Sequence, residues 1–346
     1  MKAIQLVAHG TPGKFELREV AEPPLGPGEA RVEVRACGLN HLDLWLEEGS
    51  LPIPINLPRI PGCEIAGLVT ELAPDVQGWQ VGDRVAVQSN LFCGTCEYCR
   101  QSEESMCLNN VMLGVQRDGG FAEQVVVPER ALAPLPQKVS FETSAALTLA
   151  GSTAMHMLTD RTHVRSGDWV LVMGGASGVG SAAIQIAKDL GGRVISTGST
   201  PAKREAASKL GAEFVLDTAD SKWTTEVRKI TSKRGVDLVV EHVGGAVFEQ
   251  IFLCLARGGT VVTCGATAGS KVHMDLWPFF VKQQRLMGSY GRNKNDLHAT
   301  LEWAAARRLK PVIDTLYPLE KAAEAFARLN ARDVLGKLVV QPSPSP

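Results

Sequence analysis

The amino-acid sequence predicts an α/β protein, in which a β-rich first half is followed by a parallel sheet wound by helices on both faces. Short apolar segments alternate strictly with helical patterns from about residue 140 onward, an order typical of a doubly wound parallel sheet. The first ~125 residues are instead rich in Gly and Pro and hold short alternating segments. A chain of 346 residues is long enough for about two domains.

Composition excludes several classes of function. The apolar fraction is 45%, the charged fraction 21% and the net charge −1, so no basic field favours nucleic acid or an anionic membrane. No apolar segment reaches the roughly 20 residues of a membrane-spanning helix, and the N-terminus predicts a strand without a signal peptide's cleavage pattern. We therefore expect a cytoplasmic protein, in which clustered cysteines bind metal or do redox chemistry more often than they form disulfides.

In the first half, alternating apolar residues predict strands at 30–34, 67–72 and 84–87. Clusters of turn residues lie at 23–28 and 56–62, and helical patterns are few. This part is therefore expected to be mostly β.

In the second half, the apolar segment Val170-Leu-Val-Met173 is typical of a strand covered on both faces. A Gly-rich turn and an amphipathic helix follow it, and Gly191 ends the helix. Strands and helices alternate from there, and residues 342–346 are expected to fray. The strands are expected at 194–197, 214–216, 237–240, 260–263 and 337–341, and the helices at 202–210, 223–231, 246–255, 297–308 and 319–330.

The Gly-rich turn reads Met173-Gly-Gly175-Ala-Ser-Gly178-Val-Gly180. Glycines let the backbone approach a pyrophosphate, and the helix N-terminus offers free N–H groups and a positive dipole end. Because the turn lies between a strand and a helix, it predicts a dinucleotide site; the alternative is only a tight turn. The residues expected to bind the cofactor here are Gly175, Ser177, Gly178, Val179 and Gly180.

The end of the next strand distinguishes between the two nicotinamide cofactors. A carboxylate there would accept the ribose hydroxyls of NAD, but residues 197–204 contain two cations and no Asp or Glu. Hydroxyl donors and positive charge suit a 2′-phosphate. We therefore predict NADPH, with Ser199 and Lys203 as clamps and Arg204 as a weaker candidate. The alternative is that the two cations form only the solvated first turn of a helix.

Half of the eight cysteines lie within fifteen residues, in the pattern C-x2-C-x2-C-x7-C. Four thiolates suit a closed tetrahedral zinc site, which leaves no open position for substrate and is therefore structural. An iron–sulfur cluster shares the start of the pattern but continues with a shorter gap and a Cys-Pro. Disulfides are rare in the expected compartment, and chance clustering of four cysteines is improbable. We predict one structural zinc per chain, bound by Cys93, Cys96, Cys99 and Cys107.

Together, the β-rich half, the cysteine pattern and the Gly-rich turn resemble the medium-chain dehydrogenase/reductases over essentially the whole chain. Further similar segments are Val81-Gly-Asp-Arg-Val85, Gly119-Gly-Phe-Ala-Glu123, Leu149-Ala-Gly-Ser-Thr153-Ala, Val243-Gly-Gly245 and Cys264-Gly-Ala266. The resemblance implies a GroES-like domain at 1–128, completed by 292–346, and a Rossmann domain at 129–291. It also implies that a small-molecule substrate meets the nicotinamide between the domains, and a homodimer or homotetramer that pairs through an edge strand at 285–290.

The zinc alcohol dehydrogenases of this family bind a second, catalytic zinc through a Cys, a His and a later Cys. The matching positions here hold Asn40 in Gly38-Leu-Asn-His-Leu-Asp43, Cys63 in Gly62-Cys-Glu64, and Leu149. An open catalytic zinc needs three good protein ligands, which this set does not supply. The Gly-Leu-Asn-x-x-Asp segment instead resembles the quinone oxidoreductase branch, which binds NADPH without a catalytic zinc but typically lacks the cysteine pattern.

The resemblance therefore implies an NADPH-dependent oxidoreductase that transfers hydride to a quinone or another activated carbonyl or enone. Such acceptors are already electrophilic, so alignment and polar contacts to the developing oxyanion are sufficient. Asn40 and Asp43 are expected to act in catalysis, and the further cofactor contacts are His41, Thr153, Val243 and Gly265. The alternative for His41 is an ordinary surface imidazole, and for Cys63 a buried inert thiol.

Two rival functions remain. One is a zinc-dependent alcohol dehydrogenase whose atypical catalytic zinc is bound by some of Cys37, His41, Asp43, Cys63 and Glu64. The other is a non-catalytic NADPH-binding protein. One zinc per chain favours the reductase, two favour the alcohol dehydrogenase, and binding without turnover favours the non-catalytic protein.

Overall fold

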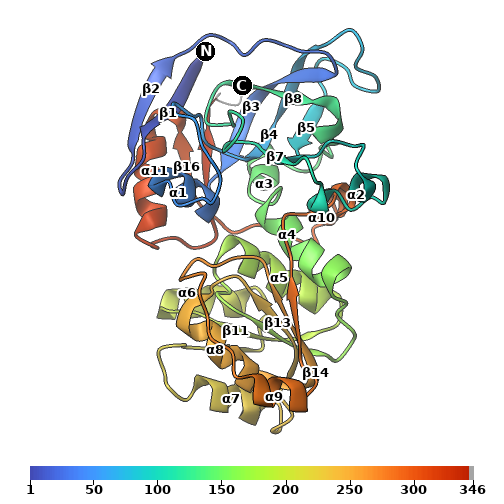
Figure 1. The fold of residues 1–346 in the computed structure, drawn as a ribbon, viewed down its shortest axis with the longest axis vertical. Coiled ribbons are helices and arrows are strands. Elements are labelled where there is room, and N and C mark those ends of the chain that lie inside the picture. Colours follow the sequence, from blue (N-terminus) through green and yellow to red (C-terminus); the bar gives the residue numbers. More distant parts are fainter. Residues whose placement is uncertain (343–346) are drawn as a thin grey trace. The chain divides into compact units, whose positions relative to one another are not determined.

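The computed structural model describes residues 1–342 and consists of two compact units (Figure 1). Unit 1 comprises Met1–Ser152 and the chain from Arg292 onward, and unit 2 comprises Thr153–Gly291. Residues 343–346, which belong to the end expected to fray, lie outside the described residues. Within the described chain, every helix is too short or too polar to cross a bilayer.

Unit 1 is built on a seven-stranded sheet in the order β16-β17-β3-β4-β5-β9, with β8 also paired to β3. The last strand of the chain, β17, runs antiparallel to β3 and places Val339 opposite Gly38. The β-rich character of the first half is confirmed. The strands of this sheet are β3 (Glu29–Gly38), β4 (Glu64–Leu72), β5 (Arg84–Val87), β8 (Gln124–Pro128), β9 (Leu132–Pro134), β16 (Ile313–Pro318) and β17 (Lys337–Gln341), and the two-stranded pairs are β1 (Lys2–Ala8) with β2 (Lys14–Glu19) and β6 (Asn90–Leu91) with β7 (Val111–Met112).

The two faces of this sheet carry side chains of different size. One face carries Val and Ile side chains, which pack with Phe121 and with Phe326 of α11 (Ala322–Asn330). The other face carries alanines such as Ala66 and Ala86, which pack under α3 (Phe141–Ala145) and α10 (Lys294–Ala305). Because the α3 segment packs in unit 1, that unit extends past residue 128, where the sequence analysis placed the domain boundary.

Unit 2 holds a six-stranded sheet in the order β12-β11-β10-β13-β14-β15, in which every strand pair is parallel. Leu171, Ile195 and Val239 pack beneath α7 (Trp223–Ile230) and α8 (Gly245–Cys254), whereas α5 (Gly178–Asp189) lies against the opposite face. This arrangement confirms the doubly wound α/β fold. The strands are β10 (Trp169–Val172), β11 (Arg193–Thr197), β12 (Phe214–Leu216), β13 (Val236–Glu241), β14 (Leu255–Thr263) and β15 (Arg285–Gly288).

Short helices interrupt the β-rich half more often than its sequence indicates, and two of them are α1 (His41–Glu48) and α2 (Glu97–Arg100). The remaining helices lie later in the chain and are α4 (Ala150–Met155), α6 (Pro201–Lys209) and α9 (Leu276–Val281). α1 ends at Gly49, whose φ of 76° is a left-handed conformation that glycine adopts readily. In unit 2, β15 forms an edge of the sheet, and its pairing with a second copy stays a prediction.

Candidate functional site

The Gly-rich turn joins β10 to α5, as expected from its sequence. Ser177 caps α5, and its Oγ accepts a hydrogen bond from the backbone N–H of Gly180 at 2.9 Å. A Cβ on Gly175 would clash with Ser196 Oγ, and a Cβ on Gly180 would clash with the carbonyl of Gly174. The turn therefore needs these glycines to bring the N–H groups and dipole of a 12-residue helix to the carboxyl edge of the sheet, an arrangement that fits a dinucleotide diphosphate.

Two more of the expected cofactor residues lie at the same edge of the sheet. Val243 follows β13 and Gly265 follows β14, and the carboxyl ends of parallel strands meet at one edge. The buried carboxylate of Glu241 braces this edge, because its Oε1 accepts from Val243 N at 2.6 Å and from Gly244 N at 2.8 Å. Its Oε2 accepts from Thr263 Oγ1 at 3.0 Å.

His242 is a candidate residue that sequence reasoning missed. Its Nε2 lies 2.9 Å from the carbonyl of Met173 and 3.3 Å from Ser177 Oγ, so the ring supports the Gly-rich turn from below. A carbonyl only accepts, so Nε2 carries the proton. Burial lowers the pKa of His242 and favours the neutral ring. No pattern in the sequence indicates this role, because only the parallel pairing of β13 with β10 brings the ring under the turn.

The end of β11 carries the residues expected to select the cofactor. Thr200 caps α6, and its Oγ1 accepts from Lys203 N at 3.2 Å, which places Ser199 and Lys203 at the entry to that helix. Arg204 is engaged within the chain, with Nη1 at 2.7 Å from Asp217 Oδ2 and 3.0 Å from Gly198 O. Arg204 therefore has its charge partly neutralised by a carboxylate that follows β12, which agrees with its weaker candidacy.

In unit 1, Glu64 is the centre of a buried polar network. The carboxylate is 0% exposed, and its Oε1 accepts from the backbone N–H groups of Leu149 at 2.6 Å and Ala150 at 3.0 Å. Its Oε2 lies 2.7 Å from Lys337 Nζ and accepts from Asn40 Nδ2 at 3.0 Å. Both charges of this ion pair are buried, and hydrogen bonds satisfy the remaining atoms, as a buried pair requires.

Asp43 links α1 to the segment that precedes β4. Its Oδ2 accepts from Asn40 N at 2.8 Å and its Oδ1 accepts from Gly62 N at 3.2 Å. Burial raises the pKa of Asp43 to about 6, and the backbone hydrogen bonds from Asn40 and Gly62 and the charge of Lys337 only partly offset this. The two expected catalytic residues are thus adjacent, and His41 begins α1 between them. Thr153 is buried in α4, at the start of unit 2.

The residues at the expected position of a catalytic zinc do not fit that ion. The thiols of Cys37 and Cys63 are buried, and burial raises the pKa of each well above its ordinary value. Asn40 directs its amide to Glu64 and Lys337. Within residues 1–342, no group of three possible ligand atoms that lie within 4.8 Å of one another includes Cys37, His41, Asp43, Cys63 or Glu64.

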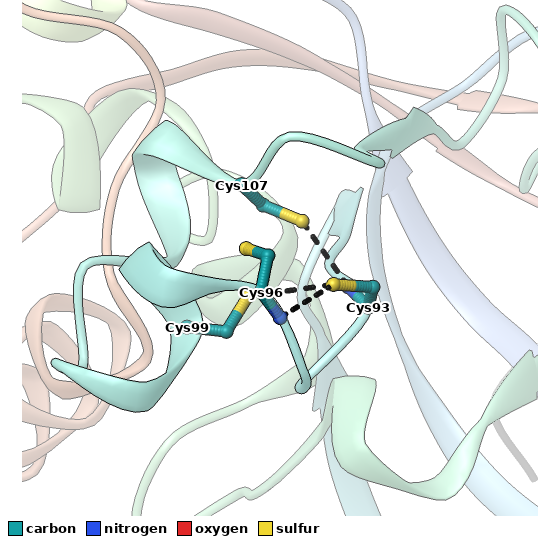
Figure 2. A group of neighbouring side chains, drawn as sticks. All are labelled: Cys93, Cys96, Cys99 and Cys107. Carbon is teal, nitrogen blue, oxygen red and sulfur yellow. Dashed lines mark hydrogen bonds between the residues drawn. The ribbon is translucent and has the colours of Figure 1, made fainter.

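The four clustered cysteines do fit a closed metal site. Their Sγ atoms all lie within 4.8 Å of one another. Cys93 Sγ accepts from Cys96 N at 3.3 Å, and Cys107 Sγ accepts from Cys93 N at 3.2 Å (Figure 2). Cys93 Sγ also accepts from Thr95 N at 3.4 Å. The N–H donors, chiefly that of Thr95, lower the pKa of Cys93 to about 5, whereas burial raises that of Cys99 to about 12. A thiolate beside a thiol 4.0 Å away is an arrangement that a divalent cation stabilises.

Hydrogen bonds from backbone N–H groups to side-chain oxygens attach this cysteine lobe, residues 93–107, to the start of α10. Asn293 Oδ1 accepts from Ser105 N at 3.0 Å, and Glu104 Oε2 accepts from Lys294 N at 3.2 Å. The lobe therefore anchors the segment by which the chain re-enters unit 1, which is a structural role.

Comparisons with known proteins cover both halves of the chain. The family model described as "Alcohol dehydrogenase GroES-like domain" matches residues 26–137, and that described as "Zinc-binding dehydrogenase" matches residues 178–306. The expected GroES-like domain is thereby confirmed.

Individual relatives match over nearly their whole length. An NAD-dependent alcohol dehydrogenase of Sulfolobus acidocaldarius is 32% identical over an alignment of 355 positions, which covers 99% of each chain. An acryloyl-coenzyme A reductase of Sulfurisphaera tokodaii is 30% identical over 343 residues, covering 99% of this chain and 100% of that protein. A solved structure of an NAD-dependent alcohol dehydrogenase superposes with a TM-score of 0.95 at 39% identity, covering 99% of this chain and 100% of that one.

Replacing one clustered cysteine tests the metal site. Cys96→Ser should release the zinc and lower the melting temperature by about 5–10 °C, because a closed site that loses one thiolate holds its ion poorly. Metal analysis and thermal unfolding measure both effects. Cys264→Ser, outside the lobe, is the control and should keep the zinc. Retained zinc with an unchanged melting temperature in Cys96→Ser would contradict a structural zinc site.

Replacing the buried carboxyl tests the network by its pH dependence. The pKa of Asp43 is about 6 in the folded chain and 3.8 ordinarily, so the folded state holds an extra proton between these values. The wild type should therefore lose about 3 kcal/mol of stability relative to Asp43→Asn as pH rises from below 3.8 to above 6. Urea unfolding of both proteins across this range measures the difference, with the exposed-site variant Asp333→Asn as control. Parallel curves for wild type and Asp43→Asn would rule out the raised pKa.

Proposed function

This chain belongs to the medium-chain dehydrogenase/reductases of the zinc-binding dehydrogenase type, and from that premise we propose that it reduces a quinone or another activated carbonyl or enone with NADPH. In this proposal it carries one structural zinc and no catalytic zinc. Membership makes the chain an NAD(P)-dependent oxidoreductase. The choice of NADPH and of an activated acceptor is the finer part of the proposal.

The observation that carries the proposal is the ion pair of Glu64 with Lys337. It binds the side chain of Asn40 and the backbone of Leu149, which are two of the three positions where zinc-dependent relatives hold their catalytic ion. The third position holds Cys63, which is buried and, within residues 1–342, belongs to no group of three possible metal ligands. Without a Lewis acid to polarise an unactivated carbonyl, the favoured acceptor is one that is electrophilic by itself. The acryloyl-coenzyme A reductase among the relatives supports this, since its name describes reduction of such an acceptor.

The residues of unit 2 would bind and orient the cofactor, which supplies the hydride. The Gly-rich turn and the N-terminus of α5 would hold the diphosphate, and His242 would keep the turn in shape through Met173 and Ser177. Ser199 and Lys203 would bind the 2′-phosphate, because a hydroxyl and an ammonium are suitable donors at a strand end that carries no carboxylate of its own. Hydride addition leaves an oxyanion on the acceptor, and solvent supplies the proton that completes the reduction.

The second candidate function is alcohol oxidation. The relatives named NAD-dependent alcohol dehydrogenase favour it, one of them being the structure at 39% identity. It requires either a divalent ion at the Glu64 network or another way to remove the alcohol proton, so metal content and acceptor choice separate the two functions.

A panel of acceptors tests the proposed reaction. We expect kcat/KM for NADPH with quinones, enones and enoyl thioesters to exceed that for NADP⁺ with primary and secondary alcohols by at least about 10-fold. The absorbance of the reduced cofactor measures both directions, and NADH and NAD⁺ serve as the cofactor comparison. Greatest efficiency with alcohols would favour the dehydrogenase instead, and binding of NADPH without any turnover would favour the non-catalytic protein.

Removing one cation tests the cofactor preference. Lys203→Ala should raise the Kd for NADPH about 10- to 100-fold and leave that for NADH nearly unchanged, because only NADPH carries the 2′-phosphate. Titration of the cofactor's fluorescence measures both constants. The matched control is Lys209→Ala, whose lysine lies at the far end of the same helix and pairs with Glu205. Equal effects of Lys203→Ala on both cofactors would reject the phosphate-clamp role.

A further inference from the structure

The turn of the β1–β2 hairpin lies against the last turn of α1, in unit 1 (Figure 1). Gly10 N donates to the carbonyl of Glu47 at 2.9 Å, and His9 Nδ1 lies 2.9 Å from the carbonyl of Leu46. A carbonyl only accepts, so Nδ1 of His9 carries a proton. The last carbonyls of a helix have no partner within the helix. The hairpin turn therefore caps the end of α1 from outside.

The side chain of Glu47 adds a third bond to the same turn. Residue Glu47 is 4% exposed, and its Oε1 accepts from Gly13 N at 2.8 Å. A Cβ on Gly13 would lie 2.7 Å from Glu47 Cγ and 3.0 Å from Leu6 Cδ1, so the turn fits closely over this side chain. Leu6 of the hairpin and Leu46 of α1 belong to one apolar cluster. The hairpin and α1 are thus joined by backbone bonds, a side-chain bond and apolar packing.

The charge of the Glu47 carboxylate does not explain its position. The last turn of α1 contains no basic residue, and the C-terminus of a helix disfavours a negative charge. Burial raises the pKa of Glu47, the charge of Glu48 adds to this, and the N–H of Gly13 offsets it only in part. What the position requires is therefore an acceptor oxygen for Gly13, which an amide would also supply.

α1 is held from both ends. It has only eight residues, and an isolated helix of that length is not stable in water. At its start, Asp43 accepts from Asn40 N and from Gly62 N, and at its end the hairpin makes the bonds described above. The two ends are about 12 Å apart, at a rise of 1.5 Å per residue. A shift at the hairpin end therefore tilts the whole helix and moves Asn40 and Asp43.

We propose that Glu47 is a positioning residue, whose side chain locks the hairpin turn onto α1 and thereby holds Asn40 and Asp43 in place for the reaction. The inference rests on the proposed function, which expects these two residues to act in catalysis, and deepens it by naming what holds their helix. A displacement on the order of 1 Å can slow a reaction about 100-fold. The lock therefore acts on hydride transfer more than on cofactor binding, because the groups that would bind the diphosphate and the 2′-phosphate lie in unit 2.

Variants of the full-length protein test the role of the acceptor oxygen. Glu47→Leu removes it and keeps a good helix former of similar size. With the best acceptor of the panel, Glu47→Leu should slow hydride transfer about 10- to 100-fold and change the Kd for NADPH less than about 3-fold. The absorbance of the reduced cofactor in a single turnover measures the rate. Glu47→Gln keeps an acceptor and should restore most of it, and Glu48→Leu, at an exposed position of the same turn, is the matched control.

Two further measurements separate positioning from loss of stability. Amide hydrogen exchange of residues 40–49 should be faster in Glu47→Leu than in Glu47→Gln or Glu48→Leu, since α1 is then loosened. Val69→Ala removes buried methyl groups from β4 without touching the hairpin turn, and it should lower the melting temperature but leave the hydride-transfer rate unchanged.

The outcomes distinguish this inference from the proposed function. An active wild type and an equally fast Glu47→Leu would overturn the inference alone, as would a slow Glu47→Leu whose rate Glu47→Gln does not restore. A wild type that turns over no acceptor would overturn the proposed function and the inference with it. If Glu47→Leu does not fold, Gly13→Ala decides, because its added Cβ presses on Glu47 Cγ. Its hydride transfer should be slowed, and an unchanged rate would contradict the inference.

Discussion

The buried ion pair between Glu64 and Lys337 is the constraint on which the chemistry of unit 1 depends. Glu64 binds the backbone at Leu149 and Ala150, and Lys337 binds Leu39 and Asn40, so the pair joins four segments that are distant in sequence. Removing one buried partner costs several kcal/mol, because the other charge is left uncompensated. The pair therefore fixes Asn40 and the backbone at Leu149, and in the proposed function it belongs to a site that reduces acceptors which need no Lewis acid.

In the proposed function, backbone groups of unit 2 bind the diphosphate, which NADH and NADPH share. Side chains bind the 2′-phosphate, which only NADPH carries. Glycines and a helix N-terminus form the turn that fits a diphosphate, and the buried His242 supports this turn from the adjacent strand end, where Glu241 holds the backbone of Val243 and Gly244. In the proposed function, the short segment after β11 selects between the cofactors through Ser199 and Lys203, while Arg204 is held by Asp217.

Features that are local in sequence could be predicted, and features made by strand pairing could not. The alternation of strands and helices, the Gly-rich turn and the spacing of Cys93 to Cys107 each lie within a short stretch, so the doubly wound fold and the grouping of the four thiols followed from the sequence. Lys337 begins a strand at the end of the chain, and nothing in its neighbours indicates that β17 carries it into the interior beside Asn40. The support of the turn by His242 depends in the same way on pairing between β10 and β13.

The central claim is that the one metal ion of this protein lies in the cysteine lobe and that the ammonium of Lys337 pairs with Glu64. Anomalous X-ray diffraction at the zinc absorption edge, from crystals of the full chain with NADPH, tests it most directly. We expect a single strong peak between Cys93, Cys96, Cys99 and Cys107, and Lys337 within hydrogen-bonding distance of Glu64. A second zinc peak bonded to Cys63 or Glu64, with Lys337 displaced, would contradict the claim.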